Sequence, residues 1–234
     1  TFSDMYFYME DVAKAVEESG IRAVLSYGMI DFGDEEKRKV EIEENMKLFK
    51  NCHDIADGRI KVFFGPHSPY TASEELLREV RKLADENNIK IHIHVSETQK
   101  EIDDVSAEKG LRPFEYLDSI GFLGPDVVAA HCVWLSDEEI ERISIILDEL
   151  EDEDIRIPIM YDTPGIAKSF RNKVYGNHNL NVWNSYNVKN LSDAGFKSII
   201  LSSELSHAEI KELVSKYQFI KTDEDVDLNI IIQG

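Results

Sequence analysis

Cysteine is scarce in this sequence, which excludes several kinds of site. The 234 residues contain only two cysteines, Cys52 and Cys132, and no CxxC pair. A disulfide framework, or a zinc or iron-sulfur site built from cysteines, cannot be drawn from two such thiols. The cysteine content therefore favours a reducing, cytoplasmic environment.

Long apolar runs are also lacking. No run approaches the roughly 20 apolar residues that a membrane-spanning helix needs. The amino-terminal stretch TFSDMYFYMEDVAK does not have the basic-then-apolar order of a signal peptide. We therefore expect a soluble protein that does not interact with a membrane.

Basic residues are few relative to acidic ones. The sequence has 26 Lys and Arg residues against 46 Asp and Glu residues, which gives a formal net charge of −20. A chain of this charge, without a basic stripe, repels the phosphate backbone of a nucleic acid. Nucleic acid is therefore excluded as a partner, whereas nothing in the composition predicts the oligomeric state.

What the sequence does contain is enough apolar material for one large core, because 42% of its residues are hydrophobic. Short β-branched runs alternate with segments of helical period, the pattern of a parallel sheet built from βα units. The predicted strands are 22–28, 60–66, 89–95, 126–133, 155–161, 180–184, 197–203 and 228–233. Eight such units predict an α/β fold of the (β/α)8 TIM-like barrel kind in a single domain, residues 1–234. An open doubly wound sheet is the alternative.

Helical segments are predicted between these strands, at 35–52, 73–88 and 206–217. Ser73 and Ser206 stand where a helix N-cap is expected. The segment ISIILD, residues 143–148, is a ninth candidate strand, and the acidic run 148–154 is interpreted as a solvated turn.

The stretch IHIHVSET, residues 91–98, has the clearest chemical potential. Side chains two apart on a strand share a face, so His92 and His94 point the same way. Active sites of parallel α/β folds lie at the carboxyl ends of the strands, where His94 and Glu97 are expected. His92 is expected one layer deeper, which makes His94 the better ligand candidate.

Two further histidines occupy equivalent places on neighbouring strands. His67 follows the predicted strand 60–66 in GPHSPYT, and His131 closes DVVAAH. Imidazole is a common ligand of zinc and iron, and Glu97 could move protons between a metal-bound water and a leaving group. A lone histidine at a strand end is most often structural, but three on adjacent strands indicate a site or a former site.

The order GPHSPYTASEELLREV, IHIHVSETQKEI and LGPDVVAAHCVWLSDEEI resembles the amidohydrolase superfamily, in particular its methylthioadenosine and S-adenosylhomocysteine deaminases. The resemblance covers residues 1–141. It implies that His94 is a metal ligand, Glu97 the proton shuttle, His67 a substrate contact and His131 a polar partner of the metal-bound water or the substrate. The implied reaction is hydrolytic deamination of an adenine ring, in which a metal-held hydroxide attacks C6 and ammonia leaves.

Other features of that family do not occur in the sequence. Its members take two further metal ligands from an HxH motif on the first barrel strand and one from an aspartate on the last, and neither motif is present. A catalytic metal site usually has three protein ligands. We therefore expect at most an incomplete zinc or iron site, with His92 and His131 as candidates to supplement His94.

From residue 142 the resemblance changes. The stretch LNVWNSYNVKNLSDAGFKSIILSSELSHAEIKELV resembles the collagenase-like peptidase family, and the likeness covers residues 142–234. It draws attention to Asn181, Asn184 and Glu204 at strand ends, although Asn184 would also serve as a helix N-cap and Glu204 could bind backbone amides.

Two half-barrels from different families predict a chimeric or designed barrel scaffold, joined near residue 141 and without full catalytic activity. Closure of one half-barrel on the other would bury the sheet edges of both. The alternative is a metal-dependent hydrolase that deaminates adenine nucleosides such as methylthioadenosine or S-adenosylhomocysteine, with a small-molecule substrate as its partner. A peptidase-like or substrate-binding role for residues 142–234 is a third hypothesis.

Overall fold

The computed structural model describes residues 1–152, 159–161, 174–177, 180–202, 204–220 and 226–229. The chain divides into two compact units, residues 1–139 and residues 140–233. The boundary falls inside α7 (Asp137–Asp152). Each unit has its own sheet and is described by itself.

The first unit is built on a parallel sheet of five strands in the order β1-β2-β3-β4-β5. The strands are β1 (Phe2–Tyr6), β2 (Ala23–Met29), β3 (Ile60–Pro66), β4 (Ile91–Val95) and β5 (Val127–His131). The helices before α7 are α1 (Met9–Ser19), α2 (Glu35–Cys52), the short α3 (Ile55–Gly58), α4 (Glu74–Asn87), α5 (Gln99–Lys109) and α6 (Pro113–Ser119). Strand order follows chain order, as expected for successive βα units.

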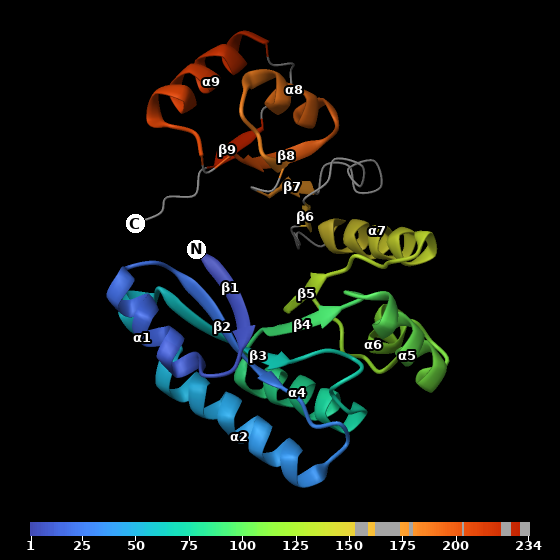
Figure 1. Ribbon diagram of the computed structural model, residues 1–234. Coiled ribbons are helices and arrows are strands. Elements are labelled where there is room, and N and C mark those ends of the chain that lie inside the picture. Colours follow the sequence, from blue (N-terminus) through green and yellow to red (C-terminus); the bar gives the residue numbers. More distant parts are fainter. Residues whose placement is uncertain (153–158, 162–173, 178–179, 203, 221–225, 230–234) are drawn as a thin grey trace. The chain divides into compact units, whose positions relative to one another are not determined.

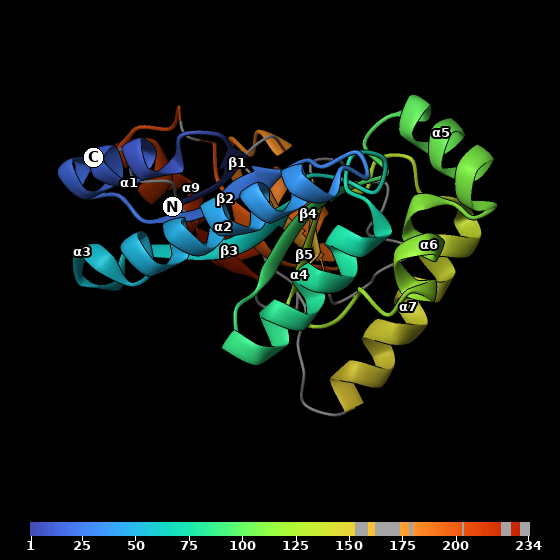
Figure 2. The ribbon, with the colours of Figure 1, turned by 90° about the horizontal axis from the view of Figure 1, so that it is seen from below.

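Helices α1, α2 and α4 cover one face of this sheet (Figures 1 and 2). The apolar face of α1 packs on the first strands because Met9, Ala13 and Val16 recur at helical spacing and are buried. They join a buried cluster with Ala23, Leu25, Leu48, Cys52, Ile60 and Val62.

The second unit has a parallel sheet of four strands in the order β6-β7-β8-β9. Its strands are β6 (Ile159–Tyr161), β7 (Val174–Gly176), β8 (Phe196–Ile200) and β9 (Asp227–Asn229), and its helices after α7 are α8 (Ser185–Asp193) and α9 (His207–Ile220). A separate buried cluster includes Val174, Val188, Phe196, Ile199 and Leu213.

The predicted α/β fold with parallel strands is confirmed. The ranges predicted for α2 and β3 are those observed, and Ser73 caps α4 by accepting a hydrogen bond from the amide of Leu76. Strands β1 and β7 were not predicted, and parts of the predicted strands 155–161 and 228–233 lie outside the described residues. Closure of a single barrel from two half-barrels stays a prediction.

Three predictions about local structure are wrong. Residues 143–148 are helical rather than a ninth strand, because Ile140 and Ile143, three residues apart, pack against the second core. The acidic run 148–154 is not a turn in its described part, because its residues up to Asp152 form the last part of α7. Its last two residues lie outside the described ones. Segment 180–184 forms no strand in its described residues, and Val182 makes an isolated bridge to Leu201.

Buried polar side chains fasten the carboxyl ends of the strands to the helices. Asp31, which follows β2, accepts a hydrogen bond of 2.7 Å from the amide of Ser73 and another from its hydroxyl, which ties β2 to the start of α4. Asn45 of α2 donates to the carbonyl of Phe63 at 3.4 Å and accepts from the amide of Gly65 at 3.1 Å. Three of these bonds satisfy backbone polar groups, namely the amides of Ser73 and Gly65 and the carbonyl of Phe63.

None of the helices in the described part of the chain is both long and apolar enough to cross a membrane.

A pair of glycines lies side by side on β2 and β3, and one of them has no room for a side chain. Gly28 and Gly65 are paired in register. A Cβ at Gly65 would lie 2.4 Å from the carbonyl oxygen of Tyr27, whereas one at Gly28 would come no closer than 3.7 Å to Met5. We expect Gly65→Ala to lower the free energy of unfolding by about 1–3 kcal/mol through overpacking.

Gly28→Ala is the matched control, and its unfolding free energy should stay within about 0.5 kcal/mol of that of the parent chain. Both values can be measured by urea denaturation followed by circular dichroism. Equal effects of the two substitutions would contradict the close approach at Gly65.

Candidate functional site

Three histidines lie together at the carboxyl ends of β3, β4 and β5. The register of the parallel strands places Val95 opposite His131, and the amide of His94 donates to the carbonyl of His67 at 3.0 Å. The ring centroid of His94 is 5.1 Å from that of His67 and 5.1 Å from that of His131. The structure therefore brings these predicted residues together, with His94 in the middle.

His67 is held in place by its backbone and by two hydroxyls. Its amide donates to the carbonyl of Met29 at 3.0 Å and its carbonyl accepts from the amide of His94, so both of its backbone polar groups are hydrogen-bonded. Its Nδ1 lies 2.8 Å from Oγ1 of Thr71 and 3.1 Å from Oγ of Ser68. With Nδ1 engaged in this way, Nε2 is left to face a ligand. Burial lowers the pKa of His67, so the ring is neutral at neutral pH.

His94 has a nitrogen without a partner. Its Nδ1 is buried, and no described residue forms a hydrogen bond with it. Burial lowers the pKa of His94, and the neighbouring rings of His67 and His131 lower it further. A buried polar atom normally has a partner, so this nitrogen suits an additional ligand. A neutral imidazole is the form that binds a metal ion.

His92 lies deeper than His94 on the same face of β4. It is only 5% exposed, and its Nδ1 lies 3.4 Å from the hydroxyl of Ser26 on β2. Burial, with smaller contributions from His94 and His131, lowers the pKa of His92 to about 4. It is therefore neutral, and its contact with Ser26 gives it a structural partner.

Glu97 and His131 form the open side of the cluster. Oε1 of Glu97 lies 3.6 Å from Nε2 of His131, and their side chains are 42% and 39% exposed respectively. His131 and Cys132 both adopt left-handed backbone conformations, with φ of 71° and 52°. This sharp turn ends β5 and leaves His131 at the edge of the sheet beside Glu97.

The turn that carries Glu97 is fastened by a residue that the sequence analysis missed. The carboxylate of Glu101 accepts hydrogen bonds of 2.8 Å from the amide of Ser96 and 2.8 Å from the amide of Glu97. The amide of Glu101 in turn donates to Oγ1 of Thr98 at 3.1 Å. The spacing Thr98-x-x-Glu101 is that of a capping box, a signal that could have identified this residue.

A metal site is not complete among these residues. In the described ranges, no group of three or more His, Cys, Asp or Glu side chains is spaced to hold a metal ion. His94 nevertheless fits a metal, because it offers a buried imidazole nitrogen that has no hydrogen-bond partner.

The residues singled out in the second half do not gather around a shared centre of this kind. Asn184 is the N-cap of α8 and accepts a hydrogen bond of 2.9 Å from the amide of Asn187. Asn181 and Glu204 are exposed, and the amide of Glu204 donates to the hydroxyl of Ser202 at 3.4 Å. The capping role of Asn184 accounts for its position without a catalytic function.

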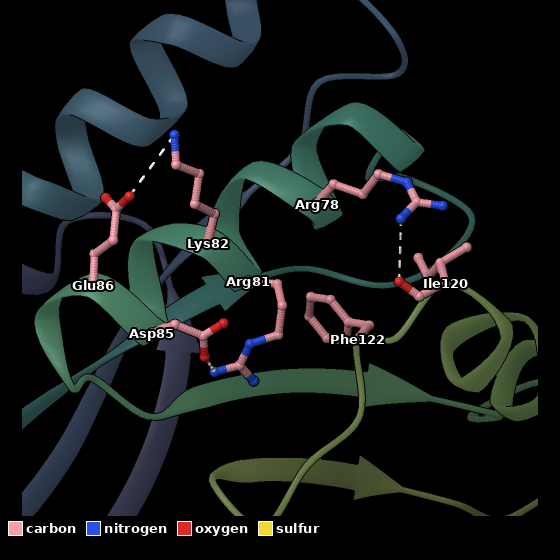
Figure 3. A pocket seen from close by; sticks show the side chains of 7 residues that line it. All are labelled: Arg78, Arg81, Lys82, Asp85, Glu86, Ile120 and Phe122. Carbon is pink, nitrogen blue, oxygen red and sulfur yellow. Dashed lines mark hydrogen bonds and ion pairs between the residues drawn. The ribbon is translucent and has the colours of Figure 1, made fainter.

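A hollow of about 290 Å³ beside α4 offers no comparable chemistry (Figure 3). Its cations already have acidic partners: Arg78 pairs with Glu74, Arg81 with Asp85 and Asp126, and Lys82 with Glu86. Because these charges are compensated, the hollow is not suited to bind an anion.

Comparison with known proteins matches residues 1–214 to the amidohydrolase family. A 5'-deoxyadenosine deaminase of Methanobrevibacter smithii is 78% identical over 143 residues, which are 61% of this chain and 33% of that protein. A 5-methylthioadenosine/S-adenosylhomocysteine deaminase of Thermococcus sibiricus is 56% identical over 144 residues, 62% of this chain and 34% of that protein. The chain thus spans about a third of the length of these relatives.

Among solved structures, an adenosine deaminase from Xanthomonas campestris with bound zinc is similar at a TM-score of 0.53 and 22% identity. The likeness covers 96% of this chain and 40% of that one. At this identity it bears on the fold alone.

The expectation of a chimeric scaffold without full activity is wrong. The family match runs from residue 1 to residue 214 and so crosses the predicted join at residue 141. The relatives with high identity are named as deaminases, which supports the alternative interpretation. The resemblance of residues 1–141 is confirmed, whereas that of residues 142–234 to collagenase-like peptidases is not shown. The chain belongs to the amidohydrolase family.

Proposed function

We propose that this chain contributes the proton-transferring side of a site that hydrolytically deaminates an adenine nucleoside. The observation that carries the proposal is the cluster of His67, His94 and His131 with Glu97 at one edge of the sheet. The names of the relatives indicate the substrate class, a 5'-deoxyadenosine or 5'-methylthioadenosine type of nucleoside. The substrate is therefore a small molecule.

The metal that the family and the zinc-bound neighbour suggest would be held by His94, through its unpartnered nitrogen. A bound divalent metal supplies electrophilic polarisation and makes water acidic enough to lose a proton near neutral pH. His94 is one ligand, and a catalytic metal site usually has three protein ligands, so further donors would complete the site.

Glu97 has the position and exposure of a general acid and base. Its carboxylate is partly exposed at the edge of the sheet and close to Nε2 of His131. From there it can take a proton from attacking water and deliver it to the amine that leaves from the adenine ring. Nε2 of His131 lies 3.6 Å from Oε1 of Glu97, so His131 can help to orient the carboxylate that carries the proton.

His67 is suited to orient the substrate. Its Nδ1 is engaged by Thr71 and Ser68, so the ring is fixed and Nε2 can contact the nucleoside. Neutral imidazole can donate or accept a single hydrogen bond, which favours recognition of a polar group rather than a charged one.

Loss of the Glu97 carboxylate should slow turnover strongly. With zinc and 5'-deoxyadenosine, we expect Glu97→Gln to lower kcat by about 10²–10⁴-fold, the usual contribution of a general acid and base. The ultraviolet change from adenine to hypoxanthine measures the rate. The control is Glu108→Gln, which removes a carboxylate that is 72% exposed and should keep the parent rate. Full activity in Glu97→Gln, or no turnover by the parent chain, would contradict the proposal.

Loss of the His94 imidazole should weaken metal binding. We expect zinc retained after dialysis, measured by inductively coupled plasma mass spectrometry, to fall by about tenfold or more in His94→Ala, since removal of groups that support a metal typically costs that much. The exposed His207 provides the control variant His207→Ala, which should retain as much zinc as the parent. If both variants retain equal zinc, His94 is not a ligand.

A further inference from the structure

One deeply buried carboxylate beside the site contacts none of the three clustered histidines. Glu101, in the first turn of α5, is 1% exposed. No ion pair joins it to a basic side chain in the part of the chain that the structure describes. A buried carboxylate without a counterion must be satisfied by hydrogen bonds, and burial raises the pKa of Glu101 while those bonds lower it.

The bonds that satisfy Glu101 come from the backbone of one short turn. Oε1 accepts from the amide of Ser96 and Oε2 from the amide of Glu97, each at 2.8 Å. Ser96 has a left-handed backbone conformation, with φ of 53°, and is buried. Its carbonyl accepts a bond of 2.9 Å from the amide of Trp134, which follows β5. The N–H and the carbonyl of Ser96 are therefore both hydrogen-bonded by residues outside the turn, which stabilises its unfavourable backbone conformation.

We propose that Glu101 is a positioning residue, which holds the Ser96–Glu97 turn so that the carboxylate of Glu97 stays beside His131. This inference rests on the proposed function, in which Glu97 moves protons. Glu101 would contact neither substrate nor metal, and it acts through the backbone of Glu97.

A simple helix cap does not account for these contacts. In the capping box of α6, Glu115 accepts a hydrogen bond of 3.1 Å from the amide of the N-cap residue, Arg112. Glu101 instead reaches past the N-cap Thr98 and binds the amides of the two residues before it. One of those residues is Glu97 itself, so the same bonds that begin α5 also fix the proposed proton shuttle.

The chemistry of the side chain explains why a carboxylate is needed. Two amide N–H groups converge on it, and only a carboxylate offers an acceptor oxygen to each. In Glu101→Gln the side-chain NH2 would face one of the amides, so one bond is replaced by a contact between two donors. The variant keeps the size of the residue and removes one anchor of the turn.

The kinetic test compares Glu101→Gln with Glu115→Gln, a capping glutamate that binds no site residue. With zinc and 5'-deoxyadenosine, we expect Glu101→Gln to lower kcat by about 10- to 100-fold, the size of effect that a small misplacement of a catalytic group produces. KM should change by less than about threefold, because substrate contacts are retained. Glu115→Gln should keep the parent kcat.

A double variant separates positioning from a general loss of stability. If Glu101 acts through Glu97, then adding Glu101→Gln to Glu97→Gln should cause no further loss of kcat. Independent losses that multiply, or an unchanged kcat in Glu101→Gln alone, would overturn the positioning role.

Amide hydrogen exchange provides a readout that does not depend on turnover. We expect the protection of the Ser96 and Glu97 amides to fall by about tenfold or more in Glu101→Gln, because local opening becomes easier, and to stay unchanged in Glu115→Gln. Unchanged protection in Glu101→Gln would overturn the inference whatever the activity. A parent chain that deaminates no adenine nucleoside would instead overturn the proposed function and the catalytic consequence of Glu101, while the exchange rates still decide whether Glu101 holds the turn.

Discussion

The candidate site depends on the parallel pairing of β3, β4 and β5. Because paired parallel strands run in one direction, their carboxyl ends meet at one edge, where His67, His94 and His131 collect. The bond from the amide of His94 to the carbonyl of His67 fixes the register at that edge. A slip of one residue would turn the side chain of Ile93 to the face that His94 now occupies and disperse the cluster.

The sequence predicts this edge well because the signals there are local. Strand β3 is a short apolar run that ends at Pro66, which has no N–H to continue the sheet, and His92 and His94 alternate with buried isoleucines. The two strands that were not predicted, β1 and β7, have weaker sequence signals. Strand β1 includes Asp4, a residue type that is uncommon in strands, and β7 has only three residues. Glu101 escaped notice because an acidic residue in a first helical turn is ordinary, and only three-dimensional contacts show which amides it binds.

The motif noted in the second half has a structural explanation. Asn184 precedes Ser185 at the start of α8, and asparagine is one of the residues that commonly cap a helix. Because capping favours the same residue types in unrelated folds, such a short motif says little about the family. A match over 214 residues averages over many such positions and so identifies the family more securely than two adjoining motifs.

The order of the strands also bears on how the cluster assembles during folding. Residues His67 to His131 lie in one continuous stretch of chain, and each strand of the first sheet pairs with its immediate predecessor. Among parallel sheets this arrangement gives the lowest contact order, because each new strand closes the shortest loop that a crossover helix allows. The histidines and Glu97 therefore come together as an outcome of forming one sheet from neighbouring segments, without waiting for distant parts of the chain.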